Sequence, residues 1–364
     1  MESTVGIALL GCGTVGGGVA ALLSQRRAHI ERKSGVSYAV VGIAGRSRDP
    51  LALVDDARVD VVIEAIGGTG IALECIERAL DHRKHVVTAN KDAIATQGPR
   101  LRALAAARGV TLRYEASVAS AVPIISTLDR ALAGDEIIEI GGVLNGTCNF
   151  ILGKMREGKS FNEALAQAQD AGYAEADPRN DIEGIDAAHK LAILMQHAFG
   201  LPVVTAHIPH RGIAGVTSAA VRRARQHGYE LKLAGYARRV PQTGTHDDRL
   251  IAQVGPVLVP FTHPFAGVSG VDNIIRVTGA SAGPLLFSGA GAGREAASSA
   301  VLGDVVATLR AIAERHGSRP LSAGAQQTPS IDPAFERFPA FAGYPVLTKG
   351  DTHVGYSSRT LSAV

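Results

Sequence analysis

The sequence has 364 residues, of which 46% are hydrophobic and 20% are charged, so it is long enough for two domains of an ordinary globular protein. Its 37 basic and 34 acidic residues leave a formal net charge of only +3, which argues against the concentrated basic surface of a nucleic-acid-binding protein. No apolar run reaches the roughly 18 residues of a membrane span, and no signal peptide is evident. We therefore expect a cytoplasmic protein with neither a nucleic-acid nor a membrane partner.

Strands and helices alternate through the first predicted domain, residues 1–130. Short apolar runs predict strands at 5–10, 37–45, 59–68, 84–91 and 110–118. Helices are predicted within 11–25, at 70–82 and at 99–109. This alternation predicts an α/β fold with a doubly wound, parallel sheet of the Rossmann type.

The pattern changes after residue 130, where helices and strands separate. Strands are predicted within 135–147 and at 230–240, 249–259 and 273–280. Helices are predicted at 161–171, where Ser160 and Glu163 form a capping box, and at 185–199. We expect an α+β domain with a mixed or antiparallel sheet at 131–295, followed by helix 296–316, which returns to the first domain.

The C-terminal segment 321–364 is predicted to be a tail. It contains five of the sixteen phenylalanine and tyrosine residues of the chain, whereas a disordered tail is usually poor in aromatic residues. We therefore expect the tail to dock on another surface, such as a partner subunit.

A glycine motif directly follows the first predicted strand and opens a helix. Gly11, Gly13 and Gly16 form G-x-G-x-x-G, in which glycines permit a tight turn, close approach to a pyrophosphate and close packing of helix on strand. The predicted dinucleotide contacts in this turn are Gly11, Gly13, Thr14, Val15 and Gly16. Arg46 follows the second strand, where an arginine suits the 2′-phosphate of NADP(H), although nearby Asp49 leaves NAD(H) open.

Five carboxylates crowd into residues 175–186, namely Glu175, Asp177, Asp181, Glu183 and Asp186. A solvated acidic loop is the simplest interpretation, and a calcium-binding EF-hand is excluded because Ile182 stands where that loop needs glycine. A third interpretation is a site for a cationic substrate such as an amino acid. Lys190 lies one helical turn after Asp186, but this spacing alone fits a simple salt bridge better than a catalytic group.

The segment 168–190 resembles the signature of homoserine dehydrogenases. The matching residues are Ala168, Gly172, Tyr173, Ala174, Asp177, Pro178, Asp181, Ile182, Gly184, Asp186 and Lys190. The stretches TANK at 88–91, YEASVASAVPII at 114–125, NGTCNFIL at 145–152 and HPFAGVSGVDN at 263–273 are also similar to the family. The resemblance covers roughly residues 5–315 and implies reversible, NAD(P)H-dependent reduction of aspartate 4-semialdehyde to homoserine.

The resemblance also implies roles for individual residues. Lys190, Lys91 and Asp181 are the implied catalytic residues, and Glu175, Asp186 and Gly172 are the implied substrate contacts. Gly67, Thr88, Lys91 and Gly293 are implied at the cofactor. The implied site for a monovalent cation, Na⁺ or K⁺, consists of Glu115, Val118, Ser120 and Val122. A homodimer joined through residues 131–290 is expected.

Some features depart from the family pattern or leave alternatives open. Cys148 replaces a usual threonine, so we expect sensitivity to thiol reagents if it lines the site. Two close lysines repel each other, so the pKa of one is expected to fall. The tail is too short for a regulatory ACT domain, which predicts the short form of the family. The alternatives are a related oxidoreductase acting on another amino-acid aldehyde or alcohol, and a non-catalytic NADP(H)-sensing relative.

Overall fold

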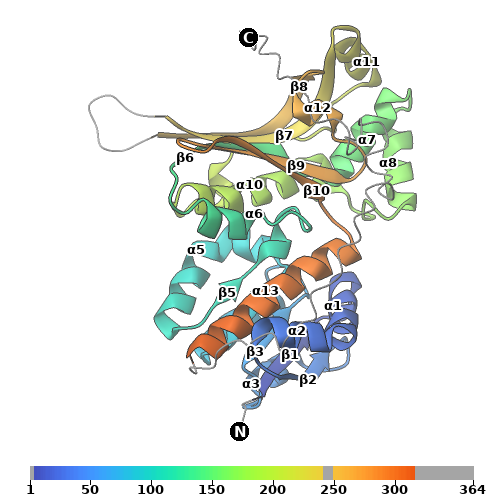
Figure 1. Ribbon diagram of the computed structural model, residues 1–364. Coiled ribbons are helices and arrows are strands. Elements are labelled where there is room, and N and C mark those ends of the chain that lie inside the picture. Colours follow the sequence, from blue (N-terminus) through green and yellow to red (C-terminus); the bar gives the residue numbers. More distant parts are fainter. Residues whose placement is uncertain (1–3, 241–248, 316–364) are drawn as a thin grey trace, which may run out of the picture. The chain divides into compact units, whose positions relative to one another are not determined.

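The computed structural model describes residues 4–240 and 249–315, and the predicted tail at 321–364 lies outside them. The first sheet is parallel and has the strand order β2-β1-β3-β4-β5 (Figure 1). Its strands are β1 (Val5–Leu10), β2 (Tyr38–Ala44), β3 (Val61–Glu64), β4 (His85–Thr88) and β5 (Leu112–Arg113). Because the order reverses between β1 and β3, the carboxyl ends of these two strands form the crevice in which such sheets bind ligands.

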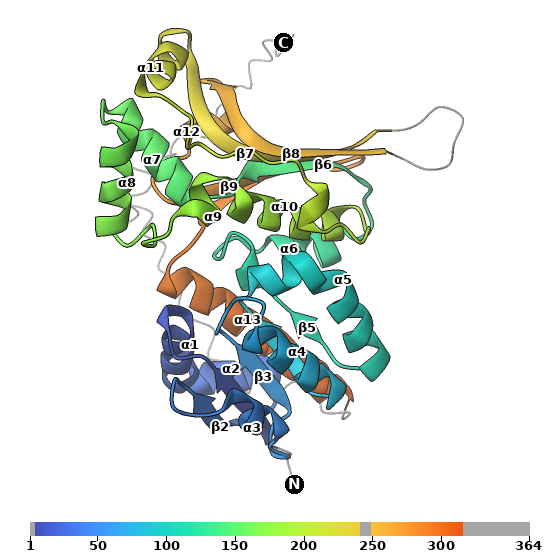
Figure 2. The same ribbon diagram turned by 180° about the vertical axis from the view of Figure 1, so that it is seen from behind.

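Helices cover both faces of this sheet. They are α1 (Thr14–Gln25), α2 (Arg27–Ser34), α3 (Pro50–Asp55), α4 (Ile71–Asp81), α5 (Lys91–Arg108) and, from the end of the described chain, α13 (Arg294–Arg315). Strand β1 is buried along its whole length: Ile7 and Leu9 belong to the core beneath α1, α2 and α13, whereas Ala8 and Leu10 belong to the core beneath α3 and α4. Figure 1 shows the first set of helices and Figure 2 the second, which confirms the predicted α/β fold.

Helix α13 is long and apolar enough, by length and composition, to cross a membrane, but it is a core helix of this fold. Val301, Val305 and Leu309 are buried against the first sheet. At Gly18 of α1, an added Cβ would lie 2.2 Å from the Ser298 hydroxyl of α13, so glycine permits the close approach of the two helices.

The second sheet is antiparallel, with the strand order β10-β9-β6-β7-β8. Its strands are β6 (Ile137–Val143), β7 (Tyr229–Val240), β8 (Arg249–Pro260), β9 (Asp272–Gly279) and β10 (Gly283–Ala290). The accompanying helices are α7 (Gly146–Arg156), α8 (Phe161–Asp170), α9 (Arg179–Ile182), α10 (Ile185–Ala198), α11 (Ser218–Gln226) and α12 (Pro264–Gly267). Helix α10 packs on β6 and β7, so its buried residues join the core of this sheet to α5 of the first (Figures 1 and 2).

The connection between the two sheets differs from the prediction. The expected strand 110–118 pairs only at Leu112 and Arg113, after which the chain forms the short helices η1 (Glu115–Ser117), α6 (Ile124–Ser126) and η2 (Thr127–Ala131). The Glu115 amide donates to the carboxylate of Asp304, 2.7 Å away, instead of to a neighbouring strand. Between α10 and α11 lies one further short helix, η3 (Thr205–His207).

Candidate active site

The glycine turn has the geometry that a dinucleotide needs. Gly11 has φ 97°, and an added Cβ would lie 2.4 Å from the carbonyl oxygen of Ala65 after β3. An added Cβ on Gly16 would lie 2.0 Å from the Gly11 carbonyl oxygen, whereas one on Gly13 would meet nothing within 4 Å. The first and third glycines are therefore required by packing, and the second leaves open space at the N-terminus of α1, where Thr14 and Val15 begin the helix.

The turn after β2 contains Arg46, the residue predicted to contact the 2′-phosphate of NADP(H). Arg46 and Arg48 are both exposed, and Arg48 also lies against β2, where an added Cβ on Gly42 would lie 2.4 Å from Arg48 Nη1. The Asp49 carboxylate accepts a hydrogen bond from the Leu51 amide at 2.9 Å and caps α3. Asp49 therefore has a structural partner within the turn.

A buried acid orders the loop after β3, and the sequence did not reveal it. Glu64 is fully buried, and its Oε1 accepts hydrogen bonds from the amides of Ile66 (2.7 Å) and Gly67 (2.8 Å). The Thr88 hydroxyl donates to Glu64 Oε2 and accepts from the Asn90 amide at 2.9 Å. Thr88 therefore shapes the loop that contains Gly67 (φ 87°) through its buried side chain.

Asn90 extends this network to Lys91. Its side-chain amide donates to the Gly68 carbonyl oxygen at 2.7 Å, and its Oδ1 accepts from the Ala93 amide at 3.0 Å, capping α5. Lys91 is the first residue of α5, so the loops after β3 and β4 together fix where this lysine begins. Neither Glu64 nor Asn90 was predicted, because their roles depend on neighbouring strands that the sequence does not pair.

A cavity of about 450 Å³ brings together all the predicted catalytic and substrate-binding residues, together with Gly293 from the predicted cofactor contacts. Its walls include Lys91, Asn145, Gly172, Glu175, Asp181, Asp186, Lys190 and Gly293. They come from the start of α5, the loop before α7, the segment from α8 to α10 and the loop before α13. Glu175 lines the cavity and is exposed, whereas Glu183 does not line it.

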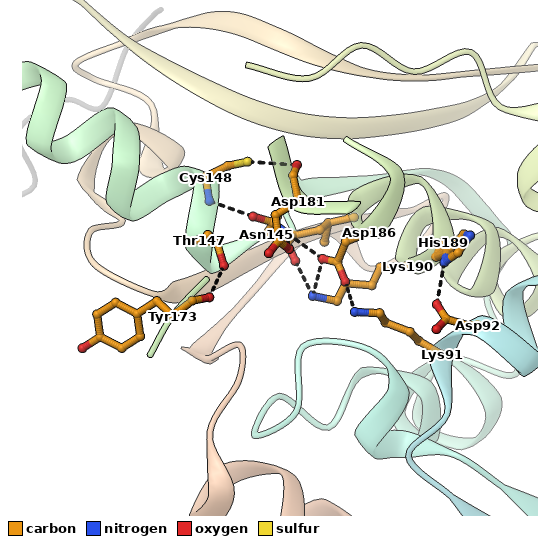
Figure 3. A network of polar contacts seen from close by, with 11 residues as sticks. Lys91, Asp92, Asn145, Thr147, Cys148, Tyr173, Asp181, Asp186, His189 and Lys190 are labelled. Carbon is orange, nitrogen blue, oxygen red and sulfur yellow. Dashed lines mark hydrogen bonds and ion pairs between the residues drawn. The ribbon is translucent and has the colours of Figure 1, made fainter. Parts of the chain in front are cut away.

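Asp186 lies between the two lysines (Figure 3). It is only 2% exposed, its Oδ2 lies 2.8 Å from Lys190 Nζ, and its Oδ1 forms an ion pair with Lys91. Lys190 Nζ also donates to the Leu144 carbonyl oxygen at 2.9 Å. Asp186 thus holds two ammonium groups, one from each side of the cavity.

The ion pairs among Lys91, Asp186 and Lys190 change the lysine pKa shift that the sequence led us to expect. Burial alone would raise the pKa of Asp186, but Lys190 and Lys91 outweigh it and hold that pKa well below its ordinary value. The charge of Asp186 in turn raises the pKa of Lys91. The expectation that repulsion lowers a lysine pKa is therefore wrong for Lys91, because a buried carboxylate lies between the two cations.

Asn145 joins the two carboxylates of the cavity and was also missed. Its Nδ2 donates to Asp181 Oδ1 at 2.6 Å and to Asp186 Oδ2 at 2.8 Å, while its Oδ1 accepts from the Cys148 amide and caps α7. Burial, followed by the charge of Asp186, raises the pKa of Asp181. Asn145 is the first residue of the NGTCNFIL stretch that resembles the family, and the local sequence does not show that it meets both carboxylates.

Cys148 does not line the cavity. Its side chain is fully buried and its thiol donates to the Asp181 carbonyl oxygen at 3.1 Å. Burial raises the pKa of this thiol well above its ordinary value. The expected sensitivity to thiol reagents therefore has no support at this position, since thiolate and access are both required.

The residues of the expected cation site share one buried loop. Both carboxylate oxygens of Glu115 accept backbone hydrogen bonds, from Ile125 at 2.7 Å and Ser126 at 2.8 Å. Ser120 has φ 33°, so this stretch is tightly curled, and Val118 and Val122 are buried beside it. Within the described ranges no group of three or more histidine, cysteine, aspartate or glutamate side chains could hold a metal.

Comparisons with known proteins agree with this arrangement. Residues 11–115 match the family model described as homoserine dehydrogenase, NAD binding domain, and residues 123–306 match the model described as homoserine dehydrogenase. The homoserine dehydrogenase of Pseudomonas aeruginosa is 40% identical over 322 residues, which are 85% of this chain and 73% of that protein.

Solved structures give the same result. A homoserine dehydrogenase from Thiobacillus denitrificans superimposes with a TM-score of 0.81 at 40% identity, covering 88% of this chain and 76% of that one. A hyperthermophilic archaeal homoserine dehydrogenase, solved in complex with NADPH, has a TM-score of 0.72 at 26% identity, covering 84% of this chain and 98% of that one. The resemblance noted in the sequence is thereby confirmed. The chain belongs to the homoserine dehydrogenase family, NAD(P)-dependent oxidoreductases of amino-acid biosynthesis that act on a CH–OH group.

Proposed function

We propose that the protein reduces L-aspartate 4-semialdehyde reversibly to L-homoserine by direct hydride transfer, with lysine acid–base catalysis. The observation that carries this proposal is the meeting of two lysines from different segments at one buried carboxylate in the cavity wall. When bound, the dinucleotide supplies a hydride to the aldehyde carbon, and the substrate oxygen becomes an alkoxide that needs a proton.

The lysines supply that proton and the compensating charge. Lys190 donates a proton to the alkoxide, and in the reverse direction its neutral amine takes the proton of the alcohol. Its contacts with Asp186 and the Leu144 carbonyl oxygen fix its position in the wall. Lys91 stabilises the developing negative charge from the α5 side.

The carboxylates hold the substrate. Asp186 and Glu175 suit the ammonium and hydroxyl groups of the amino acid, and both residues line the cavity. Asp181, bound to Asn145, supports the hydride step. Gly172, with φ 73°, shapes the loop over which the substrate lies.

The test is NADPH oxidation with aspartate semialdehyde by wild type and Lys190→Ala. We expect kcat to fall about 10²–10⁴-fold while NADPH affinity is unchanged. Lys33→Ala, which removes an exposed lysine of α2 far from the cavity lining, is the matched control and should keep full activity. Full activity of Lys190→Ala would exclude the assigned role. NADPH binding without turnover by wild type would favour the sensing alternative, and turnover only with another aldehyde would favour the related oxidoreductase.

We also propose that NADP(H) is preferred over NAD(H), through Arg46. A guanidinium group binds a phosphate through charge-assisted hydrogen bonds, and Asp49 is committed to capping α3. Arg46→Ala should lower kcat/KM for NADPH about tenfold and leave that for NADH nearly unchanged. Arg58→Ala, which removes an exposed arginine paired with Asp56, is the control. A wild-type preference for NADH would contradict the proposal.

The homodimer is proposed to form on the face of the second sheet opposite α10. This face exposes Tyr236, Ile251 and Leu286, whereas their neighbours along the strands pack into the core. Ile251→Asp should convert a dimer into a monomer in light scattering, whereas Leu201→Asp, at an exposed position outside the sheet, should not. A monomeric wild type would contradict this interface.

Other expectations stay predictions. The Glu115 loop, with Val118, Ser120 and Val122, is proposed to bind Na⁺ or K⁺ through backbone carbonyl oxygens. Its test is turnover in chloride salts of Na⁺, K⁺ and tetramethylammonium at equal ionic strength, and equal rates in all three would contradict the site. The domain limits at 130 and 295 and the cytoplasmic location are likewise proposed.

A further inference from the structure

A second contact between α5 and α10 lies beside the lysine pair (Figure 3). Asp92 follows Lys91 in the first turn of α5, and its Oδ1 lies 2.9 Å from Nδ1 of His189, the residue before Lys190 on α10. Both side chains are half-buried, at 32% and 17% exposure. The hydrogen bond to His189 lowers the pKa of Asp92.

The two contacts form a matched set. Lys91 and Asp92 are consecutive on α5, and their partners Asp186 and His189 are three residues apart on one face of α10. Each contact therefore ties the same turn of α5 to the same turn of α10. The two contacts respond differently to bound substrate. The substrate ammonium group competes with Lys91 for Asp186, so substrate weakens that ion pair. Neither Asp92 nor His189 lines the cavity, so their contact stays intact.

We propose that Asp92 and His189 are a positioning pair that holds the first turn of α5 on α10 and keeps Lys91 in the cavity when Asp186 engages the substrate. This inference rests on the proposed roles of Lys91 and Asp186. A displacement of about 1 Å can cost roughly 10²-fold in rate, so a contact one residue away from a catalytic group is enough to matter.

The rest of the helix interface does not depend on this pair. Farther along α5, Arg102 donates to Gln196 of α10 at 3.1 Å and to the Tyr114 hydroxyl at 3.0 Å. Ile94 and Leu101 are fully buried in the shared core. Loss of the Asp92–His189 contact should therefore loosen one turn without unfolding the protein.

The experiment is a double-mutant cycle with Asp92→Ala and His189→Ala. We expect each to lower kcat about tenfold, and the double variant to be no slower than either single one, because both remove the same contact. KM for NADPH and the melting temperature should change little. His189→Asn, whose side-chain amide is attached at Cγ like the histidine Nδ1 and can still donate to Asp92, should restore most of the activity, and Asp81→Asn, which breaks the exposed Asp81–Arg108 pair, is the matched control.

The Lys91→Ala background separates this inference from the proposed function. Because Lys91→Ala is expected to turn over slowly, its kcat is measured at high enzyme concentration. In this variant, removing Asp92 or His189 should not lower kcat further. A further loss in that background would overturn the inference, because the pair would then act other than through Lys91. Full activity of Asp92→Ala and His189→Ala, with Lys91→Ala impaired, would overturn the positioning pair alone. Full activity of Lys91→Ala would instead overturn the role of that lysine.

Discussion

Asp304 makes the stability of this protein depend on pH in an unusual direction. Its carboxyl group on α13 is 8% exposed, and Oδ2 accepts the Glu115 amide at 2.7 Å. Burial, helped by the charge of Glu115, raises the pKa of Asp304 to about 7 from an ordinary 3.8, although Arg113 and Arg130 oppose this shift. The native state therefore keeps this proton to higher pH than the unfolded chain does. We therefore expect the contribution of Asp304 to stability to fall as pH rises from about 4 to about 7 and to be lost above that.

The pKa difference corresponds to about 4 kcal/mol of unfolding free energy at about pH 8. Asp304→Asn removes the ionisation and keeps an oxygen for the Glu115 amide, but its buried NH₂ group costs about 1 kcal/mol. The variant should therefore be more stable than wild type by about 3 kcal/mol at about pH 8 and by under about 1 kcal/mol at about pH 5.

Urea unfolding at the two pH values measures this difference. Asp170→Asn, which removes an exposed carboxylate of α8, controls for the loss of one negative charge. An equal gain for Asp304→Asn at both pH values would refute the reasoning, because the Asp304 carboxyl would then titrate as it does in the unfolded chain.

Three further predictions follow from the site. Asp186→Asn removes the charge that raises the pKa of Lys91, so the alkaline limb of the kcat–pH profile should move to lower pH; an unchanged limb would contradict this assignment. Iodoacetamide should label exposed Cys12 in the native protein and leave buried Cys148 unmodified by mass spectrometry, and NADPH should protect Cys12 because it lies in the glycine turn. Gly16→Ala should abolish NADPH binding in fluorescence titration, since its Cβ would lie 2.0 Å from a backbone oxygen of the same turn.

The parts of the site that depend on local sequence could be predicted. The glycine spacing between a strand and a helix identified the turn, and the structure shows a steric need for glycine at Gly16, against the turn itself, and at Gly11, against Ala65 after β3. The helical spacing placed Asp186 and Lys190 on one face, and they form an ion pair at 2.8 Å. The resemblance of the TANK stretch at 88–91 to the family added Lys91, whose partner no local pattern could identify.

The start of α5 shows where sequence reasoning was limited. Pro99 suggested that a helix begins there, because proline lacks an amide donor and usually stands in the first turn. The helix instead begins at Lys91 and continues through Pro99, since Asn90 caps it and Ile94 and Leu101 are buried on either side of the proline. The burial of Ile94 and Leu101 in the core thus outweighs the loss of the backbone hydrogen bond that Pro99 cannot donate. The sequence alone does not show which of these two energies is larger.

Asn145 binds two carboxylates, Asp186 and Asp181, whose surroundings shift their pKa values in opposite directions. Asp186 contacts two ammonium groups and keeps a low pKa, so it stays charged as lysines and substrate exchange around it. Asp181 has no such contact; burial and its charged neighbour raise its pKa. Carboxyl groups whose pKa values are pushed apart can perform different tasks at one pH. Asp186 is therefore suited to fix charge and position, whereas the surroundings of Asp181 favour its neutral form more than those of Asp186 do.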